Sequence, residues 1–228
     1  MTEPPQLHRV RVWDLPTRIF HWTLLLGLIG LVVTASIGGS AMNWHFRFGY
    51  TVTTLLLFRL VWGLIGGRWS RFSAFIYAPA TILNYLKGAG RPRDSVGHTP
   101  LGAFSVFGLL GFLAAQVTTG MLSDDEIAFA GPLSRFVSNS TVSLASSYHA
   151  DIGKWIVLAL VLLHFAAIAY YQRRKHHLIG AMVFGDKTLA TPEPGSRDDA
   201  LSRLLALLVL SACASVVYWI SSLGAPAF

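Results

Sequence analysis

The sequence is poor in cysteine and in charged residues. Its one cysteine, Cys213, lies in an apolar run, which excludes an intrachain disulfide framework, a CxxC metal site and an iron–sulfur cluster held by several thiolates. Only 13% of the residues are charged, against roughly 25% in an ordinary soluble domain, and 53% are hydrophobic. This balance excludes a disordered chain and argues against a soluble globular enzyme.

Long apolar runs take the place of the missing charge. A helix needs about 20 apolar residues to cross the hydrocarbon core of a bilayer, and five stretches reach that length. These stretches are Phe20–Gly39, His45–Gly66, Leu101–Leu122, His149–Tyr171 and Leu201–Leu223. The predicted fold class is therefore all-α, an integral membrane four-helix bundle with an appended fifth transmembrane helix.

The remaining segments divide the chain into four parts. We expect residues 1–19 to form an uncleaved cytoplasmic arm, because they are charged and lack a cleavage site after a short apolar core. Residues 20–187 form the four-helix domain, in which Tyr77–Leu86 has the spacing of a short interfacial helix and residues 123–147 are typical of a loop. Residues 188–200 have the composition of a linker, and residues 201–228 form the C-terminal transmembrane helix.

Lysine and arginine are unevenly distributed between the segments that separate the spans. Fourteen lie in the arm, in the loop after the second span and in the segment after the fourth, against three on the opposite side, Arg47, Arg135 and Lys154. Cytoplasmic loops carry such an excess, so we expect the N-terminus in the cytoplasm and the C-terminus on the other side of the membrane. The net charge of +7 then reflects contact with membrane lipid, and we expect no nucleic-acid partner.

Four of the eight histidines lie in the apolar spans or at their ends. His21 is near the cytoplasmic end of the first span and His164 approaches the cytoplasmic end of the fourth, whereas His45 and His149 both begin inward-running spans. Along one α-helix His149 and His164 are about 22 Å apart and about 60° apart in azimuth, so both can face the bundle interior. The topology therefore predicts two pairs at two depths, His45 with His149 and His21 with His164.

Two imidazoles that face each other from different helices are the axial ligands that the iron of a low-spin b-type haem needs. A zinc or copper site is one alternative, but no cysteine or carboxylate accompanies either pair at ligand spacing. A second alternative is that these histidines bind no metal and only pack and form hydrogen bonds between helices. Arg59 lies about 21 Å inward of His45, at the depth of the inner pair, where it binds a haem propionate or snorkels to the cytoplasmic headgroups.

Several motifs resemble the bacterial cytochrome b561 family, which is related to the b-type cytochrome subunits of nickel–iron hydrogenases. These motifs are Val12-Trp13-Asp14-Leu15-Pro16-Thr17-Arg18-Ile19-Phe20-His21-Trp22, the segment from Trp44-His45 to Gly49-Tyr50, Phe58-Arg59-Leu60-Val61-Trp62-Gly63, Gly97-His98-Thr99-Pro100-Leu101-Gly102 and His164. The resemblance runs from about Arg11 to Lys187. It implies a four-helix bundle with two haems b in the bacterial inner membrane, which exchanges electrons with ubiquinone or menaquinone. The four histidines paired above match the family's ligand positions, and the fifth helix departs from its four-helix members.

Three functions fit these features. The first is electron transfer between the quinone pool and a periplasmic c-type cytochrome or dehydrogenase, with the acidic run Asp124–Glu126 as a docking surface for a basic cytochrome. The second is a self-contained superoxide:quinone oxidoreductase, and the third is a non-redox membrane scaffold or transporter. Asp151 and Lys154, near the outer pair, are candidates for proton exchange with a quinone, and ordinary surface charges are the alternative.

Overall fold

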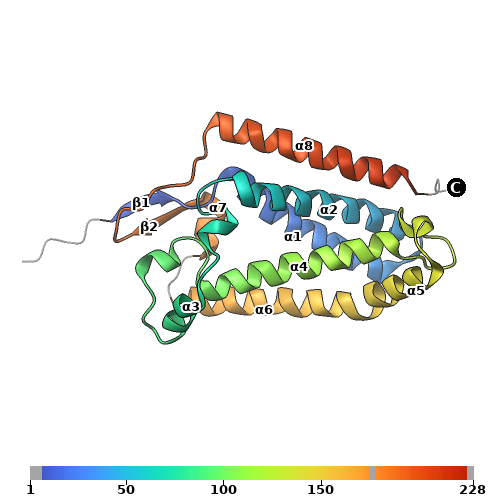
Figure 1. The fold of residues 1–228 in the computed structure, drawn as a ribbon, viewed down its shortest axis with the longest axis horizontal. Helices are drawn as coiled ribbons and strands as arrows, with labels where there is room; N and C mark the ends of the chain where they lie inside the picture. The colour runs from blue at the N-terminus through green and yellow to red at the C-terminus, as the bar shows by residue number, and fades with distance from the viewer. Residues whose placement is uncertain (1–6, 175–177, 225–228) are drawn as a thin grey trace, which may run out of the picture. The chain divides into compact units, whose positions relative to one another are not determined.

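Five long helices dominate the computed structural model, which describes residues 7–174 and 178–224 (Figure 1). They are α1 (Leu15–Ile37), α2 (Met42–Ile65), α4 (Pro100–Leu122), α6 (Lys154–Arg173) and α8 (Ala200–Ser222). Each belongs to a helical stretch that is long and apolar enough to cross a membrane. The predicted all-α membrane architecture with a fifth span is thus confirmed.

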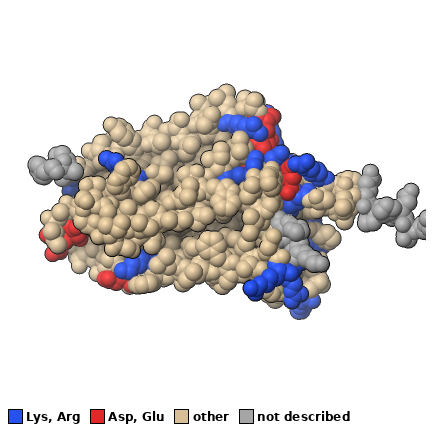
Figure 2. Space-filling model, turned by 180° about the vertical axis from the view of Figure 1, so that it is seen from behind, with Lys and Arg blue, Asp and Glu red and all other residues tan. Residues whose placement is uncertain are grey.

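The chain divides into two compact units, and every one of the long helices contributes residues to both. The first unit comprises Met1–Phe20, Arg59–Val106 and His164–Leu207, and the second comprises His21–Phe58, Phe107–Leu163 and Leu208–Phe228. Among the described lysines and arginines, the second unit holds Arg47, Arg135 and Lys154, and the first holds the rest. Figure 2 shows a broad tan surface that carries almost no charged side chain, as a surface in contact with hydrocarbon should be.

The core of the second unit joins four of the long helices through aliphatic side chains. Val52 and Leu56 of α2 are buried with Leu113 of α4 and Val157 of α6, and leucines of α1 pack against them. Lipid tails are as apolar as leucine, so close packing and hydrogen bonds, rather than removal from water, hold such helices together. This packing fixes the helices that carry the outer histidines.

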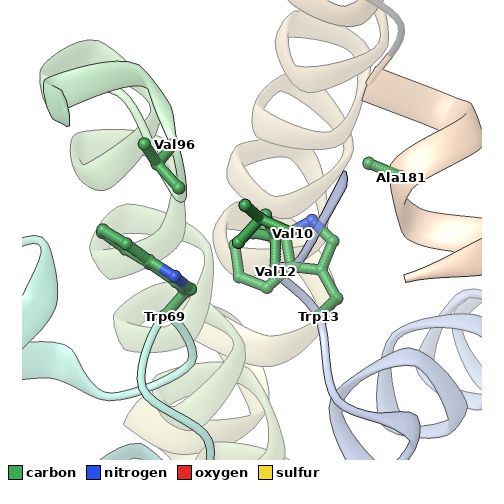
Figure 3. Packing of buried hydrophobic residues seen from close by; sticks show 6 residues of the cluster. All are labelled: Val10, Val12, Trp13, Trp69, Val96 and Ala181. Atoms are coloured by element: carbon green, nitrogen blue, oxygen red, sulfur yellow. The ribbon is translucent and has the colours of Figure 1, made fainter. Parts of the chain in front are cut away.

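The first unit has a separate core outside the long helices. Strand β1 (His8–Arg11) pairs antiparallel with β2 (Asp186–Leu189), with His8 opposite Leu189 and Arg11 opposite Asp186. Figure 3 shows the buried cluster beside this sheet, which draws its members from the arm, from the loop after α2 and from α7 (Leu178–Phe184). Its members are Val10, Val12, Trp13, Trp69, Val96 and Ala181. The cluster therefore binds three segments that are distant in sequence.

Asp14 connects the arm, α1 and the end of α2 within this unit. Its side chain is fully buried. The backbone N–H of Thr17 and the indole N–H of Trp62 donate to Oδ1 at 2.8 Å and 3.1 Å, and the N–H of Gly67 and the hydroxyl of Ser70 donate to Oδ2 at 3.1 Å and 2.9 Å. A Cβ at Gly67 would collide with Oδ2, so only glycine fits there. Four donors thus satisfy both oxygens of the buried carboxylate.

Helix α1 begins at Leu15, five residues before the apolar stretch predicted to start at Phe20. Asp14 accepts the N–H of Thr17 as a helix N-cap, and Pro16 lies in the first turn, where its missing N–H costs nothing. The first turn of α1 contains polar residues, so it lies outside the apolar run that predicted the span. Residues 1–6 of the arm lie outside the described part of the chain.

The segment expected to be a linker is bound to the arm. Its start forms β2, and further along the N–H of Ser196 donates to the carbonyl of Arg11 at 2.6 Å, while the Ser196 hydroxyl donates to the carbonyl of Val12 at 2.8 Å. Asp198 then forms ion pairs with Arg11 at 3.4 Å and with Arg203 at 3.1 Å. The composition suggested a free connection, but these hydrogen bonds fix the position at which α8 begins.

The two loops between spans contain helices. The short helix predicted over Tyr77–Leu86 is present as α3 (Pro79–Leu86), with proline in its first turn, and its position at the membrane interface stays a prediction. The stretch after α4 was predicted as a loop up to Ser147, but Asn139–Ser147 forms α5, which the hydroxyl of Ser138 caps by accepting the N–H of Thr141. The serine and threonine residues that suggested a loop therefore include a helix N-cap.

Candidate functional site

His45 and His149 face each other in the second unit. His45 lies in the first turn of α2, His149 lies just before α6, and their ring centroids are 6.2 Å apart with the ring planes at 88°. Two imidazoles that bind one metal ion from opposite sides, each at about 2 Å, have ring centres about 6 Å apart. The spacing therefore suits a shared metal centre between the two rings.

Hydrogen bonds to backbone carbonyls fix which nitrogen of each ring is available. Nδ1 of His45 lies 3.1 Å from the carbonyl oxygen of Leu31, and Nδ1 of His149 lies 2.8 Å from that of Gln116. A carbonyl oxygen only accepts, so each neutral imidazole carries its hydrogen on Nδ1 and its lone pair on Nε2. A second hydrogen bond of this kind is typical of histidines that bind a metal.

Gln116 of α4 holds His149 from two sides. Its backbone carbonyl accepts from the ring, and its side-chain amide donates to the carbonyl of His149 at 2.9 Å. His149 itself lies in a π-helical turn, Tyr148–Gly153, which joins α5 to α6. Such turns are rare and frequent at functional sites. Because a π-turn rotates less per residue than an α-helix, the azimuth calculated for His149 relative to His164 on one straight helix does not apply.

Two glycines leave space around this pair. A Cβ at Gly120 of α4 would lie 2.7 Å from Cε1 of His149, so the glycine allows the ring to rest against α4. Gly49, one turn after His45, has no atom within 4 Å of the position that a Cβ would take, although the residue is half-buried. A flat macrocycle needs such open backbone next to its ligands.

The acidic run lies in an ordered loop of the same unit. The N–H groups of Ile127, Ala128 and Phe129 all donate to Oδ1 of Asp125, which lowers the pKa of this carboxyl and keeps it charged. The ring of Phe129 stacks on Phe46, the residue after His45, at a centroid distance of 6.1 Å. The loop thus holds fixed negative charge close to the start of α2.

The two candidates for proton exchange lie on the surface. Asp151 and Lys154 are both exposed, and the ammonium of Lys154 lies 5.4 Å from the centre of the Trp155 ring. This position agrees with the alternative that they are ordinary surface charges.

His21 and His164 belong to different units of the structure, so their predicted pairing stays a prediction. His21 is the seventh residue of α1 and contacts the ring of Trp22 at 5.5 Å. His164 lies within α6, with Nδ1 3.4 Å from the hydroxyl oxygen of Ser105. Each ring is partly buried and lies in a membrane-spanning helix, which is where a ligand of an inner haem has to be.

Arg59 is a buried cation without a complete set of partners. Its residue is 3% exposed, its guanidinium lies 4.8 Å from the ring centre of Phe72, and its Nη1 has no hydrogen-bond partner in the described chain. The charge of Asp14 acts on it, but four donors already occupy that carboxylate. The burial argues against snorkelling. A buried cation is costly without an anionic partner, and among the described residues no side chain accepts a hydrogen bond from Nη1, so this atom suits an added anionic group.

The donor set fits a metal that brings its other ligands with it. The described residues contain no cluster of three or more histidine, cysteine, aspartate or glutamate side chains that could hold a metal ion. Zinc and copper sites need such clusters, whereas a porphyrin supplies four nitrogens and leaves two positions for the protein. Two imidazoles, open backbone beside them and a buried guanidinium elsewhere in the chain, whose Nη1 has no hydrogen-bond partner among the described residues, together fit haem b.

Comparisons with known proteins point the same way. The sequence pattern of the family described as prokaryotic cytochrome b561 matches residues 12–185. The chain is 27% identical over 187 residues to the probable Ni/Fe-hydrogenase 1 B-type cytochrome subunit of Escherichia coli K12, which covers 67% of this chain and 79% of that protein. It is 26% identical over 212 residues to the probable Ni/Fe-hydrogenase B-type cytochrome subunit of Cupriavidus necator, and the alignment covers 78% of this chain and 86% of that protein. The corresponding protein of Azotobacter vinelandii is 23% identical over 222 residues, and that alignment covers 81% of this chain and 91% of the relative. No solved structure gives a significant match.

Proposed function

Because this chain belongs to the prokaryotic cytochrome b561 family, we propose that it is a di-haem cytochrome that passes single electrons between the quinone pool and a redox partner. The family and the five candidate spans together make the chain a multi-pass membrane b-type cytochrome of electron transfer.

The observation that carries the proposal is the geometry of His45 and His149. Their ring centroids are 6.2 Å apart. In each ring Nδ1 donates to a backbone carbonyl oxygen, so Nε2 keeps its lone pair and can bind a metal ion. Haem b, when bound there, supplies an iron centre that gains and loses one electron. The chain contributes two ligands already fixed in one tautomer by their hydrogen bonds to backbone carbonyls.

His21, His164 and Arg59 are proposed to hold the second haem. Each histidine would supply one axial ligand, and the unpaired Nη1 of Arg59 would donate a charge-assisted hydrogen bond to a propionate. Arg59 and His164 belong to the first unit and His21 belongs to the second.

The names of the relatives support a hydrogenase as the redox partner. The matched proteins of Escherichia coli, Cupriavidus necator and Azotobacter vinelandii are described as B-type cytochrome subunits of Ni/Fe hydrogenases. A periplasmic c-type cytochrome or dehydrogenase is the other partner that the acidic loop around Asp125 suits. With either partner, the protein is proposed to lie in the inner membrane with its N-terminus on the cytoplasmic side, which the excess of lysine and arginine in the first unit supports. His45 and His149 then lie on the periplasmic side.

The function is tested with the purified, haem-loaded chain in nanodiscs. A short-chain ubiquinol or menaquinol added without any other reductant is expected to reduce the haems, and an artificial electron acceptor is expected to reoxidise them. Haems that neither quinol reduces and that, once reduced by dithionite, neither quinone reoxidises would contradict the role of the quinone. Copurification of hydrogenase subunits from the native membrane tests the partner separately.

Replacing Arg59 by glutamine is expected to lower the midpoint potential of one haem by tens of millivolts. Reduction adds negative charge, and a buried cation stabilises the reduced form more than the oxidised form. The control is Arg47→Gln, which removes an exposed cation of the second unit. A redox titration that finds both potentials unchanged in Arg59→Gln would show that Arg59 does not serve a haem.

A further inference from the structure

A cavity of about 270 Å³ lies in the first unit between the end of α2 and the beginning of α8. Ile65 and the Gly66–Gly67 backbone form its wall on the side of α2, and Arg197, Leu201 and Leu205 line the side of α8. The family match ends at residue 185, so helix α8 and the residues before it add half of this cavity to the bundle. None of the lining residues takes part in the proposed haem sites.

The cavity lies at the ends of two helices that are long and apolar enough to cross a membrane. The candidate span that includes α2 ends at Ile65, and the candidate span of α8 begins at Ala200. Three of the apolar side chains that line the cavity are also exposed on the protein surface: Ile65 at 49%, Leu201 at 62% and Leu205 at 41%. A ligand of this cavity therefore has an apolar part that lies against these side chains in the bilayer.

Arg197 forms the polar end of the cavity and is the charged residue among those that line it. Asp199 pairs with Arg197 at 2.6 Å, but the Arg197 side chain is still 62% exposed and keeps donors for another group. The other carboxylate nearby in the chain, Asp198, is already shared among Arg11, Arg18 and Arg203. An anionic group therefore suits this end better than a neutral one.

We propose that this cavity binds the headgroup of an anionic phospholipid, whose phosphate pairs with Arg197 and whose first methylene groups lie against Leu201 and Leu205. The volume accommodates a glycerophosphate headgroup and the start of an acyl chain, not a whole lipid. Such a lipid connects α8 to the end of α2. The site is independent of the redox role, because it uses neither the histidines nor Arg59.

Native mass spectrometry of the full haem-loaded chain, titrated with phosphatidylglycerol or phosphatidylcholine, tests the proposal. One molecule of phosphatidylglycerol is expected to bind more tightly than phosphatidylcholine. Arg197→Gln should weaken phosphatidylglycerol binding about tenfold, the loss of one charge-assisted hydrogen bond. Asp199→Asn should strengthen it, because asparagine still caps α8 at the Ser202 N–H but no longer competes for Arg197.

Two matched pairs keep the test specific. Leu201→Trp should block the cavity, while Leu204→Trp, an exposed position on the same helix outside it, should leave binding unchanged. Arg93→Gln, an exposed arginine of the same unit, is the control for Arg197→Gln. Equal binding of both lipids, equal losses in the control variants or retention of a neutral quinone at this site would overturn the proposal. Unchanged haem spectra identify variants that are folded, so the charge variants decide the outcome even where a tryptophan variant fails to fold.

Discussion

Replacing His149 by alanine is expected to remove one of two haems and leave the other intact. The ring of His149 lies 6.2 Å from that of His45, and the hydrogen bond of its Nδ1 to the carbonyl of Gln116 leaves the Nε2 lone pair available for the proposed iron ligation. A haem that keeps one imidazole of two loses its low-spin character and most of its affinity. We therefore expect the haem content to fall from about two per chain to about one, measured as pyridine haemochrome against protein.

His45→Ala should remove the same haem, so the double variant His45→Ala/His149→Ala should retain as much haem as either single variant. His8→Ala is the control, because His8 lies in β1 at the edge of the first unit and should not affect either haem. If the two single variants lost spectrally different haems, or the double variant lost both, the pairing of His45 with His149 would be wrong.

Replacing Asp14 by alanine is expected to be the most destabilising single change outside the haem ligands. The substitution leaves four buried donors without an acceptor: the N–H groups of Thr17 and Gly67, the indole of Trp62 and the hydroxyl of Ser70. Each such group costs roughly 1–3 kcal/mol, so the free energy of unfolding should fall by several kcal/mol. We expect little protein in the membrane and a much lower thermal midpoint in detergent.

Asp125→Ala is the matched control for Asp14→Ala. The carboxylate of Asp125 also accepts several N–H groups, those of Ile127, Ala128 and Phe129, but in an exposed loop where water can replace it. Its loss should cost about 1 kcal/mol. Similar thermal midpoints for the two variants would show that Asp14 does not organise the first unit as described.

Much of the fold could be predicted from the sequence because a bilayer imposes a length on each apolar run. The five spans agree with α1, α2, α4, α6 and α8 in number and order, and α3 appears where apolar residues recur at helical spacing. The boundaries were less predictable wherever polar residues form the end of a helix. Asp14 and Ser138 are both helix N-caps, and each lies in a stretch that composition alone assigned to an arm or a loop.

Some residues of the candidate site could be predicted from the sequence, and others depend on the fold. His45 and His149 could be paired from depth alone, because two helix starts on one side of a membrane lie close together. Gln116 was missed, although a single glutamine inside the apolar run of α4 is itself a signal of a polar role. The π-turn at Tyr148–Gly153 has no sequence pattern that periodicity detects, and the contact of Gly120 with His149 depends on the fold.

The haem content of the purified chain tests the central claim most directly. The molar ratio of extracted haem b to protein, with the protein determined by amino-acid analysis, is predicted to be two per chain. Both haems are predicted to be low-spin in the oxidised state. A value of one would contradict the proposal of two haems, and the histidine variants would then show which of the two proposed sites is occupied. A colourless protein, expressed with sufficient haem supply, would contradict the assignment of the membrane histidines as ligands altogether.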